Sequence, residues 1–195
     1  MIKTTDMLLD ELSDYANPEM KLSRMVQQGA VFPIVRGLYE TDRHAPPAAL
    51  AGSIYGPSYV SFDYALSAYG LIPEAVRMVT SATFDKKKKK RYETPFGVFT
   101  YRDVPRAAFP LALVVQQEGD YYYRMASPEK ALCDKLYTLP PQPGQKALAV
   151  CLAEDLRIDE AALRALDAAL VETLAARYRA TNVRNLAALL RRLAK

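Results

Sequence analysis

The sequence is poor in the side chains that most often carry catalysis or bind metal ions. Its 195 residues include one histidine, two cysteines and no tryptophan. A lone histidine, His44, excludes most histidine-based triads and metal sites, which need further positioned partners. Cys133 and Cys151 lack the paired spacing of a zinc site, so we expect two reduced, buried thiols rather than a disulfide. No glycine-rich phosphate loop of either standard spacing occurs.

Long hydrophobic runs are also missing. No apolar run approaches the roughly 18 residues that a membrane-spanning helix needs. The first residues lack the basic-then-apolar order of a signal peptide. Half of the residues are apolar and a quarter are charged, which is ordinary for a protein with a buried core. We therefore expect a cytoplasmic protein that makes no contact with a membrane.

Positive charge is present but unevenly distributed. The formal net charge of +4 is a mild indication of a polyanionic partner. Residues 1–45 hold five Lys/Arg against seven Asp/Glu, whereas residues 46–110 hold nine against five. Most of the excess is one run, which consists of Lys86, Lys87, Lys88, Lys89, Lys90 and Arg91. The basic character of the whole chain therefore says little about its N-terminal part.

The N-terminal residues have the outline of a DNA-binding module. Residues 4–15 predict a helix capped by Thr4 or Thr5, and Asn17-Pro18 starts a second helix that runs to about residue 28. Residues 30–39 predict a short ribbon that turns at Arg36-Gly37. Helix, turn, helix and ribbon is the order of a winged helix-turn-helix. Because only two helices precede the ribbon, we predict an abbreviated form over residues 1–42.

The second helix carries the predicted DNA contacts. Its polar face holds Lys21, Arg24, Gln27 and Gln28, residue types that suit guanine, adenine or phosphate in the major groove. Arg36 at the ribbon turn is placed to reach a phosphate or the minor groove. The run from Lys86 to Arg91 predicts non-specific phosphate contacts. The alternatives are an ordinary exposed helix face, a surface turn residue and a solvated loop.

Residues 48–138 predict a mixed α/β domain with antiparallel hairpins. The run from Gly56 to Pro73 predicts a helix that is capped by Ser58 or Ser61 and ends in a left-handed Gly70. Residues 76–84 predict a strand, and two hairpins follow over residues 92–101 and 111–125. Ser127-Pro128 then starts a helix that reaches Tyr137.

A proline-rich break at residues 140–144 precedes an Ala/Leu-rich end of the chain. Leucine stripes there predict three helices, at 146–154, 160–178 and 182–194. We expect residues 145–195 to form a C-terminal helical bundle packed on the second domain. The predicted fold class is therefore α+β.

Two fragments of sequence imitate known enzymes without completing a site. Gly52-Ser53 followed by Asp63 is faintly similar to a nucleotidyltransferase, but the second metal-binding acid of that chemistry is missing. Glu19-Met20-Lys21 imitates a nuclease motif on a helix rather than a strand. We therefore expect no catalytic residue, no metal site and no cofactor. An unrecognised nuclease or transferase is the alternative.

Several sequence blocks resemble AbiEi-type antitoxins, which are also described as predicted transcriptional regulators of viral defence. The resemblance covers residues 5–138 in order. Its blocks are Met20–Gly29 with Ile34–Tyr39 for the last helix and wing, Gly56–Leu71 for a Tyr-Val-Ser…Ala-Leu…Gly-Leu block, Thr80–Thr83 and Phe96–Tyr101 for a strand pair, and Ser127–Tyr137 for a Pro-Glu-Lys-Ala-Leu block.

The resemblance implies the antitoxin of a type IV toxin–antitoxin system for abortive infection of phage-infected cells. Such a protein binds inverted repeats in its own double-stranded promoter DNA through a winged helix. Its second domain counters a nucleotidyltransferase-like toxin. A homodimer is expected where the operator is palindromic. The alternative is a non-catalytic protein-interaction module in which a vestigial winged helix serves as packing.

Overall fold

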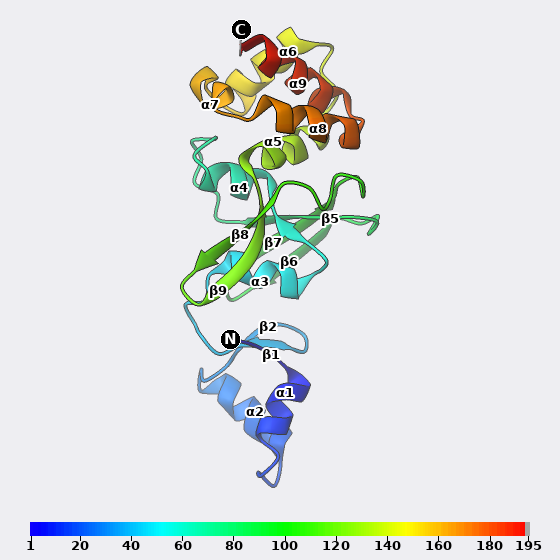
Figure 1. Cartoon of the computed structure of the whole chain (residues 1–195). Helices are drawn as coiled ribbons and strands as arrows, with labels where there is room; N and C mark the ends of the chain where they lie inside the picture. Colours follow the sequence, from blue (N-terminus) through cyan, green and yellow to red (C-terminus); the bar gives the residue numbers. More distant parts are fainter. Residues whose placement is uncertain (194–195) are drawn as a thin grey trace.

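The computed structural model describes residues 1–193, which form an elongated α+β molecule. A small N-terminal sheet with its helices, a six-stranded sheet and the C-terminal helices follow one another along its length (Figure 1). The predicted fold class is confirmed at this level. We call residues 1–44 the N-terminal tier and residues 45–193 the body.

The N-terminal tier combines two helices with a three-stranded antiparallel sheet in the order β1-β3-β2. The elements are β1 (Ile2–Thr4), α1 (Thr5–Glu11), α2 (Pro18–Gln27), β2 (Phe32–Val35) and β3 (Leu38–Glu40). Side chains of Thr4 and Asn17 cap the two helices, as predicted. The predicted first helix was too long, and the strand β1 was not predicted because Ile2-Lys3-Thr4 is too short to show a period.

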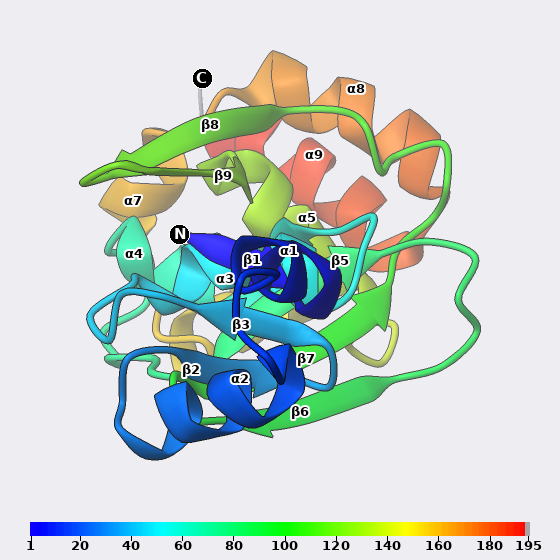
Figure 2. The ribbon, with the colours of Figure 1, turned by 90° about the horizontal axis from the view of Figure 1, so that it is seen from below.

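The body is built on a six-stranded mixed sheet with the order β6-β7-β5-β4-β9-β8. Its strands are β4 (Tyr59–Val60), β5 (Val79–Thr83), β6 (Lys90–Thr94), β7 (Gly97–Asp103), β8 (Leu113–Glu118) and β9 (Tyr121–Ala126). Both predicted hairpins, β6–β7 and β8–β9, are confirmed. They form the two opposite sides of the sheet (Figure 2).

Helices cover both faces of this sheet (Figure 1). Helix α3 (Pro47–Ile54) packs on one face, where the Tyr101 hydroxyl of β7 donates to the Ala51 carbonyl at 2.8 Å. Helices α4 (Phe62–Ala68) and α5 (Pro128–Tyr137) pack on the other face. Residues 47–54, which precede Gly56, thus form a separate helix with Pro47 at its first position.

The run from Gly56 to Pro73 is only partly the predicted helix. Strand β4 lies near its start, and α4 begins only at Phe62 and ends at Ala68. Ser61 stands at the cap position but makes no capping bond, because its hydroxyl donates to the Asp134 carboxylate at 2.6 Å. The predicted end is confirmed: Gly70 has φ +69°, and the Leu71 N–H bonds to the Leu66 carbonyl at 2.9 Å. This pattern is a Schellman motif.

The C-terminal part contains more helices than predicted. The elements are α6 (Gln145–Val150), a π-helical turn η1 (Cys151–Asp155), α7 (Glu160–Arg164), α8 (Ala168–Tyr178) and α9 (Thr181–Leu193). The predicted helix over 160–178 is broken because Asp167 caps a new helix, accepting from the Ala169 N–H at 2.9 Å. Residue 194 of the last predicted helix lies outside the described residues. Over residues 1–193, no helix has the length and apolar character needed to cross a bilayer.

The C-terminal helices share one hydrophobic core with the sheet. This core extends from Ile34 to Leu190 and includes side chains of α8 and α9. The buried Asn182 amide of α9 strengthens the connection, since it donates to the carbonyls of Leu136 and Pro140 at 3.0 Å each. The tier has its own small cluster, formed by Leu8, Leu12, Leu22 and Val31.

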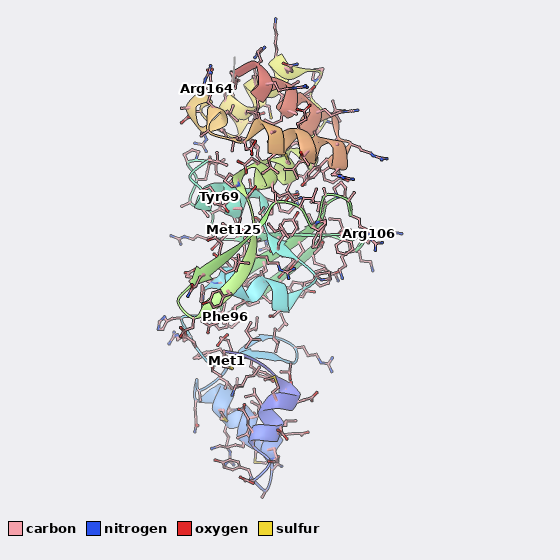
Figure 3. All side chains as sticks on the ribbon, in the orientation of Figure 1. Met1, Tyr69, Phe96, Arg106, Met125 and Arg164 are labelled. Atoms are coloured by element: carbon pink, nitrogen blue, oxygen red, sulfur yellow. The ribbon has the colours of Figure 1, made fainter. Side chains whose placement is uncertain are left out.

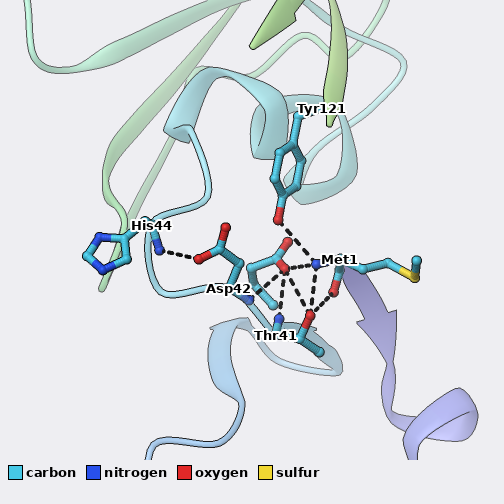
Figure 4. Close-up of polar contacts among 6 residues, drawn as sticks. Met1, Thr41, Asp42, His44 and Tyr121 are labelled. Atoms are coloured by element: carbon cyan, nitrogen blue, oxygen red, sulfur yellow. Dashed lines mark hydrogen bonds and ion pairs between the residues drawn. The ribbon is translucent and has the colours of Figure 1, made fainter. Parts of the chain in front are cut away.

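A buried carboxylate lies where the tier meets the body (Figure 4). Glu40 pairs with the Met1 ammonium, and one of its oxygens accepts from the backbone N–H groups of Thr41 and Asp42 at 2.7 and 3.0 Å. The ammonium also donates to the Tyr121 hydroxyl of the body at 3.1 Å. Burial opposes ionisation of Glu40, but these hydrogen bonds outweigh it and lower the pKa of the carboxyl.

An aromatic contact reinforces this junction. The ring of Phe32 in the tier meets that of Phe96 in the body edge-on, with centroids 6.3 Å apart. Met1 and Phe96 mark the level of the junction in Figure 3. The tier is thus attached to the body by both a polar and an apolar contact.

Candidate nucleic-acid interface

The predicted contact residues of the second helix share the exposed side of α2. Asn17 accepts the Met20 N–H at 2.9 Å, and Pro18 takes the first helical position. Leu22 is buried against α1, which turns the opposite side of α2 outward. The outward side chains are Arg24, Gln27 and Gln28, with Lys21 half-buried.

In the described part of the chain, no carboxylate neutralises the two cations of this face. The Lys21 ammonium lies over the Tyr15 ring, 4.8 Å from its centroid. The Arg24 guanidinium lies 3.5 Å from the Met20 sulfur. Among the described residues, neither cation forms an ion pair. Both remain available to an external anion.

Most of the acidic residues of the tier lie outside α2. Asp6, Asp10 and Asp14 are exposed on α1 and just after it. Glu11 pairs with Lys3 at 2.6 Å, and Glu40 is buried at the junction. Glu19 is the acid that α2 itself carries. The two helices therefore differ in the sign of their net charge, which is negative on α1 and positive on α2.

Arg36 follows strand β2 and is therefore carried by the tier's sheet, not by α2. It is exposed at the β2–β3 turn, where Gly37 has φ +81° and accepts the Thr5 N–H at 3.1 Å. A groove of about 510 Å³ runs between α1 and α2 and reaches from Gln27 to Thr5. The turn carrying Arg36 is thus anchored to the start of α1, and the helix face and Arg36 form two separate contact points.

The run from Lys86 to Arg91 does not present one continuous cationic strip. Lys86 turns aside, and its ammonium donates to the Gly56 carbonyl at 3.0 Å. Arg91 bonds Glu93 at 2.9 Å. Lys87, Lys88 and Lys89 instead border a hollow that they share with Arg102. The structure therefore places Lys86 and Arg91 in surroundings different from those of these three lysines.

A buried polar cluster was missed by the sequence prediction. Lys130 and Asp134 pair at 2.9 Å on α5, and neither side chain has any solvent exposure. The Tyr59 hydroxyl donates to the same carboxylate at 3.0 Å, and the Tyr178 hydroxyl bonds both charged groups. Burial, reinforced by Asp134, raises the pKa of both tyrosines, so they act as neutral donors. The i,i+4 spacing of Lys130 and Asp134 was the one signal of this pair.

This cluster connects β4, α5 and α8 and is closed to solvent. It joins the Tyr59-Val60-Ser61 block to the Lys130 block, which lie far apart in the sequence. We assign it a structural role.

Comparisons of the chain with known protein families and with curated proteins find no match. Within residues 1–193, no group of three or more His, Cys, Asp or Glu side chains is placed to hold a metal ion.

Proposed function

We propose that the N-terminal tier is a reduced winged helix that binds promoter DNA, and that the protein is an AbiEi-type antitoxin and transcriptional autoregulator. The observation that carries the proposal is the outward face of α2, where Lys21 and Arg24 stand beside two glutamines. Within residues 1–193, neither cation has an acidic partner. Cations that are already neutralised gain little from phosphate, whereas free cations release counterions from DNA on binding.

In this proposal α2 is the recognition helix and β2–β3 is the wing. Gln27 and Gln28 follow Arg24 on the outward side of α2, and glutamine and arginine are the side chains that read adenine and guanine edges. Arg36 at the wing turn supplies a phosphate or minor-groove contact. Most acids of the tier lie outside α2, which leaves the basic face of that helix open to a polyanion.

The body supplies the antitoxin activity, without catalysis, against a nucleotidyltransferase-like toxin. The resemblance to AbiEi-type antitoxins supports this part of the proposal. Two of the blocks that carry the resemblance meet in the buried cluster of Tyr59, Ser61, Lys130 and Asp134. These blocks therefore specify the scaffold of the body, and its working surface lies elsewhere.

A gel-shift titration with a duplex fragment from upstream of the reading frame tests the DNA-binding proposal. We expect Arg24→Ala/Arg36→Ala to weaken binding about tenfold or more and to reduce the salt slope by about two. The matched control is Arg177→Ala/Arg184→Ala, which removes two exposed arginines of the C-terminal helices. Equal binding by wild type and the Arg24/Arg36 variant would overturn the contact assignment.

A protein-interaction module is the second candidate, and exposed apolar side chains favour it. Met7, Tyr15 and Met20 of the tier are 47, 49 and 52% exposed. Such side chains suit a protein partner better than a phosphate backbone. This candidate predicts no salt-sensitive DNA binding, together with a stable complex that Met20→Lys disrupts in size-exclusion chromatography.

A further inference from the structure

One part of the large sheet forms the floor of a polar hollow. Along β7, Phe99 and Tyr101 are buried, while Thr100 and Arg102 alternate with them on the opposite face. Thr100 pairs with Arg91 of β6, so that arginine shares the face of Thr100 and Arg102. Three neighbouring strands, β6, β7 and β5, contribute to the lining.

Helices α4 and α5 form the walls of this hollow. Phe62 and Asp63 come from the start of α4, and Lys135 comes from α5 and pairs with Asp63 at 2.6 Å. The hollow has a volume of about 240 Å³. A second hollow of about 320 Å³ adjoins it and shares Arg102 and Thr138 with it. We call the two together the cationic basin.

Cations outnumber carboxylates in the lining of the basin. The cationic residues are Lys87, Lys88, Lys89, Arg91, Arg102 and Lys135, and the acidic ones are Asp63 and Asp103. Arg102 stands at the junction of the two hollows and, within the described residues, forms no ion pair. A concave surface with an excess of one sign of charge attracts a counter-ion.

The loop that brings the lysines to the basin is held in an unfavourable backbone conformation. Asp85 and Lys87 have φ values of +54° and +55°, a region that non-glycine residues rarely occupy. The Asp103 carboxylate holds the loop, accepting the Lys87 N–H and the Thr83 hydroxyl at 2.6 Å each. Arg106, labelled in Figure 3, lies beside the loop, 3.4 Å from the Asp85 carboxylate. Strained backbone of this kind persists only where the surrounding contacts hold it in place, and it is often found at functional sites.

We propose that the cationic basin binds a nucleoside polyphosphate. Arg102 and the loop lysines hold the phosphate chain, because a guanidinium is the preferred partner for phosphate oxygens. The smaller hollow has an apolar part, Phe62 and Met78, and hydroxyls from Thr100 and Thr138, which suit the nucleoside. Each hollow is close to the lower end of the range of small-ligand sites, roughly 300–1,000 Å³. This proposal is independent of DNA binding by the tier.

Isothermal titration calorimetry at low salt with EDTA tests the proposal. The probes are ATP, GTP, CTP, UTP and inorganic tripolyphosphate. We expect at least one nucleotide to bind more tightly than tripolyphosphate, and binding to weaken with salt. Arg102→Gln, a change at an exposed residue, removes charge-assisted hydrogen bonds and should weaken binding by about 10- to 100-fold.

Two control variants separate the basin from other cations. Lys86→Gln changes a lysine of the same loop that points to Gly56, and Arg24→Ala/Arg36→Ala changes the tier. We expect both to retain nucleotide binding within about twofold, since each keeps the lining intact.

Four outcomes overturn the proposal. Absence of nucleotide binding, or equal binding by wild type and Arg102→Gln, would refute the proposed binding site. Equal affinity for tripolyphosphate and every nucleotide removes the nucleoside part. Tighter binding of a short single-stranded oligonucleotide that is lost in Arg102→Gln indicates a nucleic-acid site instead.

Discussion

The N-terminal tier and the body differ in the size of the hydrophobic core that stabilises each of them. The tier's own cluster has four buried side chains, whereas the core of the body runs through its sheet and its C-terminal helices. Cations are placed differently as well. Within residues 1–193, Lys21 and Arg24 lie unpaired on the outside of α2, while the body buries Lys130 in an ion pair and places other cations in a hollow. Small cores leave little margin of stability. The main core also includes Ile34 of β2, so the tier depends on its junction with the body for part of its stability.

The largest expected effect is on the body. Asp134→Ala leaves the buried Lys130 without its partner, and we expect a loss of about 4 kcal/mol in the free energy of unfolding. Urea denaturation followed by circular dichroism measures it. Glu154→Ala, at an exposed position, should change stability by less than about 0.5 kcal/mol. Wild-type stability of Asp134→Ala would contradict the structural role of the cluster.

An intermediate effect is expected in the tier. Leu8→Ala opens a cavity in a cluster of four buried residues. It should lower the free energy of unfolding by about 3 kcal/mol. Hydrogen exchange should then lose protection in α1 and α2 while β5 and β7 keep theirs. Met7→Ala, next to it and exposed, is the control. Equal loss of protection in both regions would show that tier and body unfold as one unit.

The smallest effect concerns the junction and depends on pH. The pKa of Glu40 is lowered in the folded state. Its contribution to the free energy of unfolding is therefore complete above the pKa of an unfolded glutamate, about 4.3. It is lost as the pH falls through the lower pKa of the folded state. Wild type should therefore lose tier protection on acidification from pH 6 to 3 more steeply than Glu40→Gln. Identical pH profiles of the two proteins would refute the role of Glu40.

Local sequence rules predicted the parts of the fold that depend on neighbours. The hairpins, the Asn17 cap and the Gly70 helix end follow from turn and cap chemistry. Ser61 was misread as a cap because its actual partner, Asp134, is 73 residues away. The break before α8 was hidden because the leucine stripe continues through it.

The same distinction applies to the sites. The exposed face of α2 was predictable, since helical spacing alone places Arg24 and Gln28 on one side. The cationic basin was not, because sheet order brings Arg102 next to Lys135 and the lysine loop. Lys86 and Lys87 are neighbours in sequence, yet they point to different surroundings.

The contacts made by Tyr178 and Asn182 determine where the chain tolerates being cut. Both residues belong to the C-terminal helices, and both bond groups of α5 or of the residues just after it. A fragment ending at residue 138 would expose a charged pair and a row of apolar side chains together, so it should be insoluble or degraded. Deletion mapping of the protein should therefore place its cut in the segment between Glu40 and Pro47, which leaves the remaining body with all of these bonds.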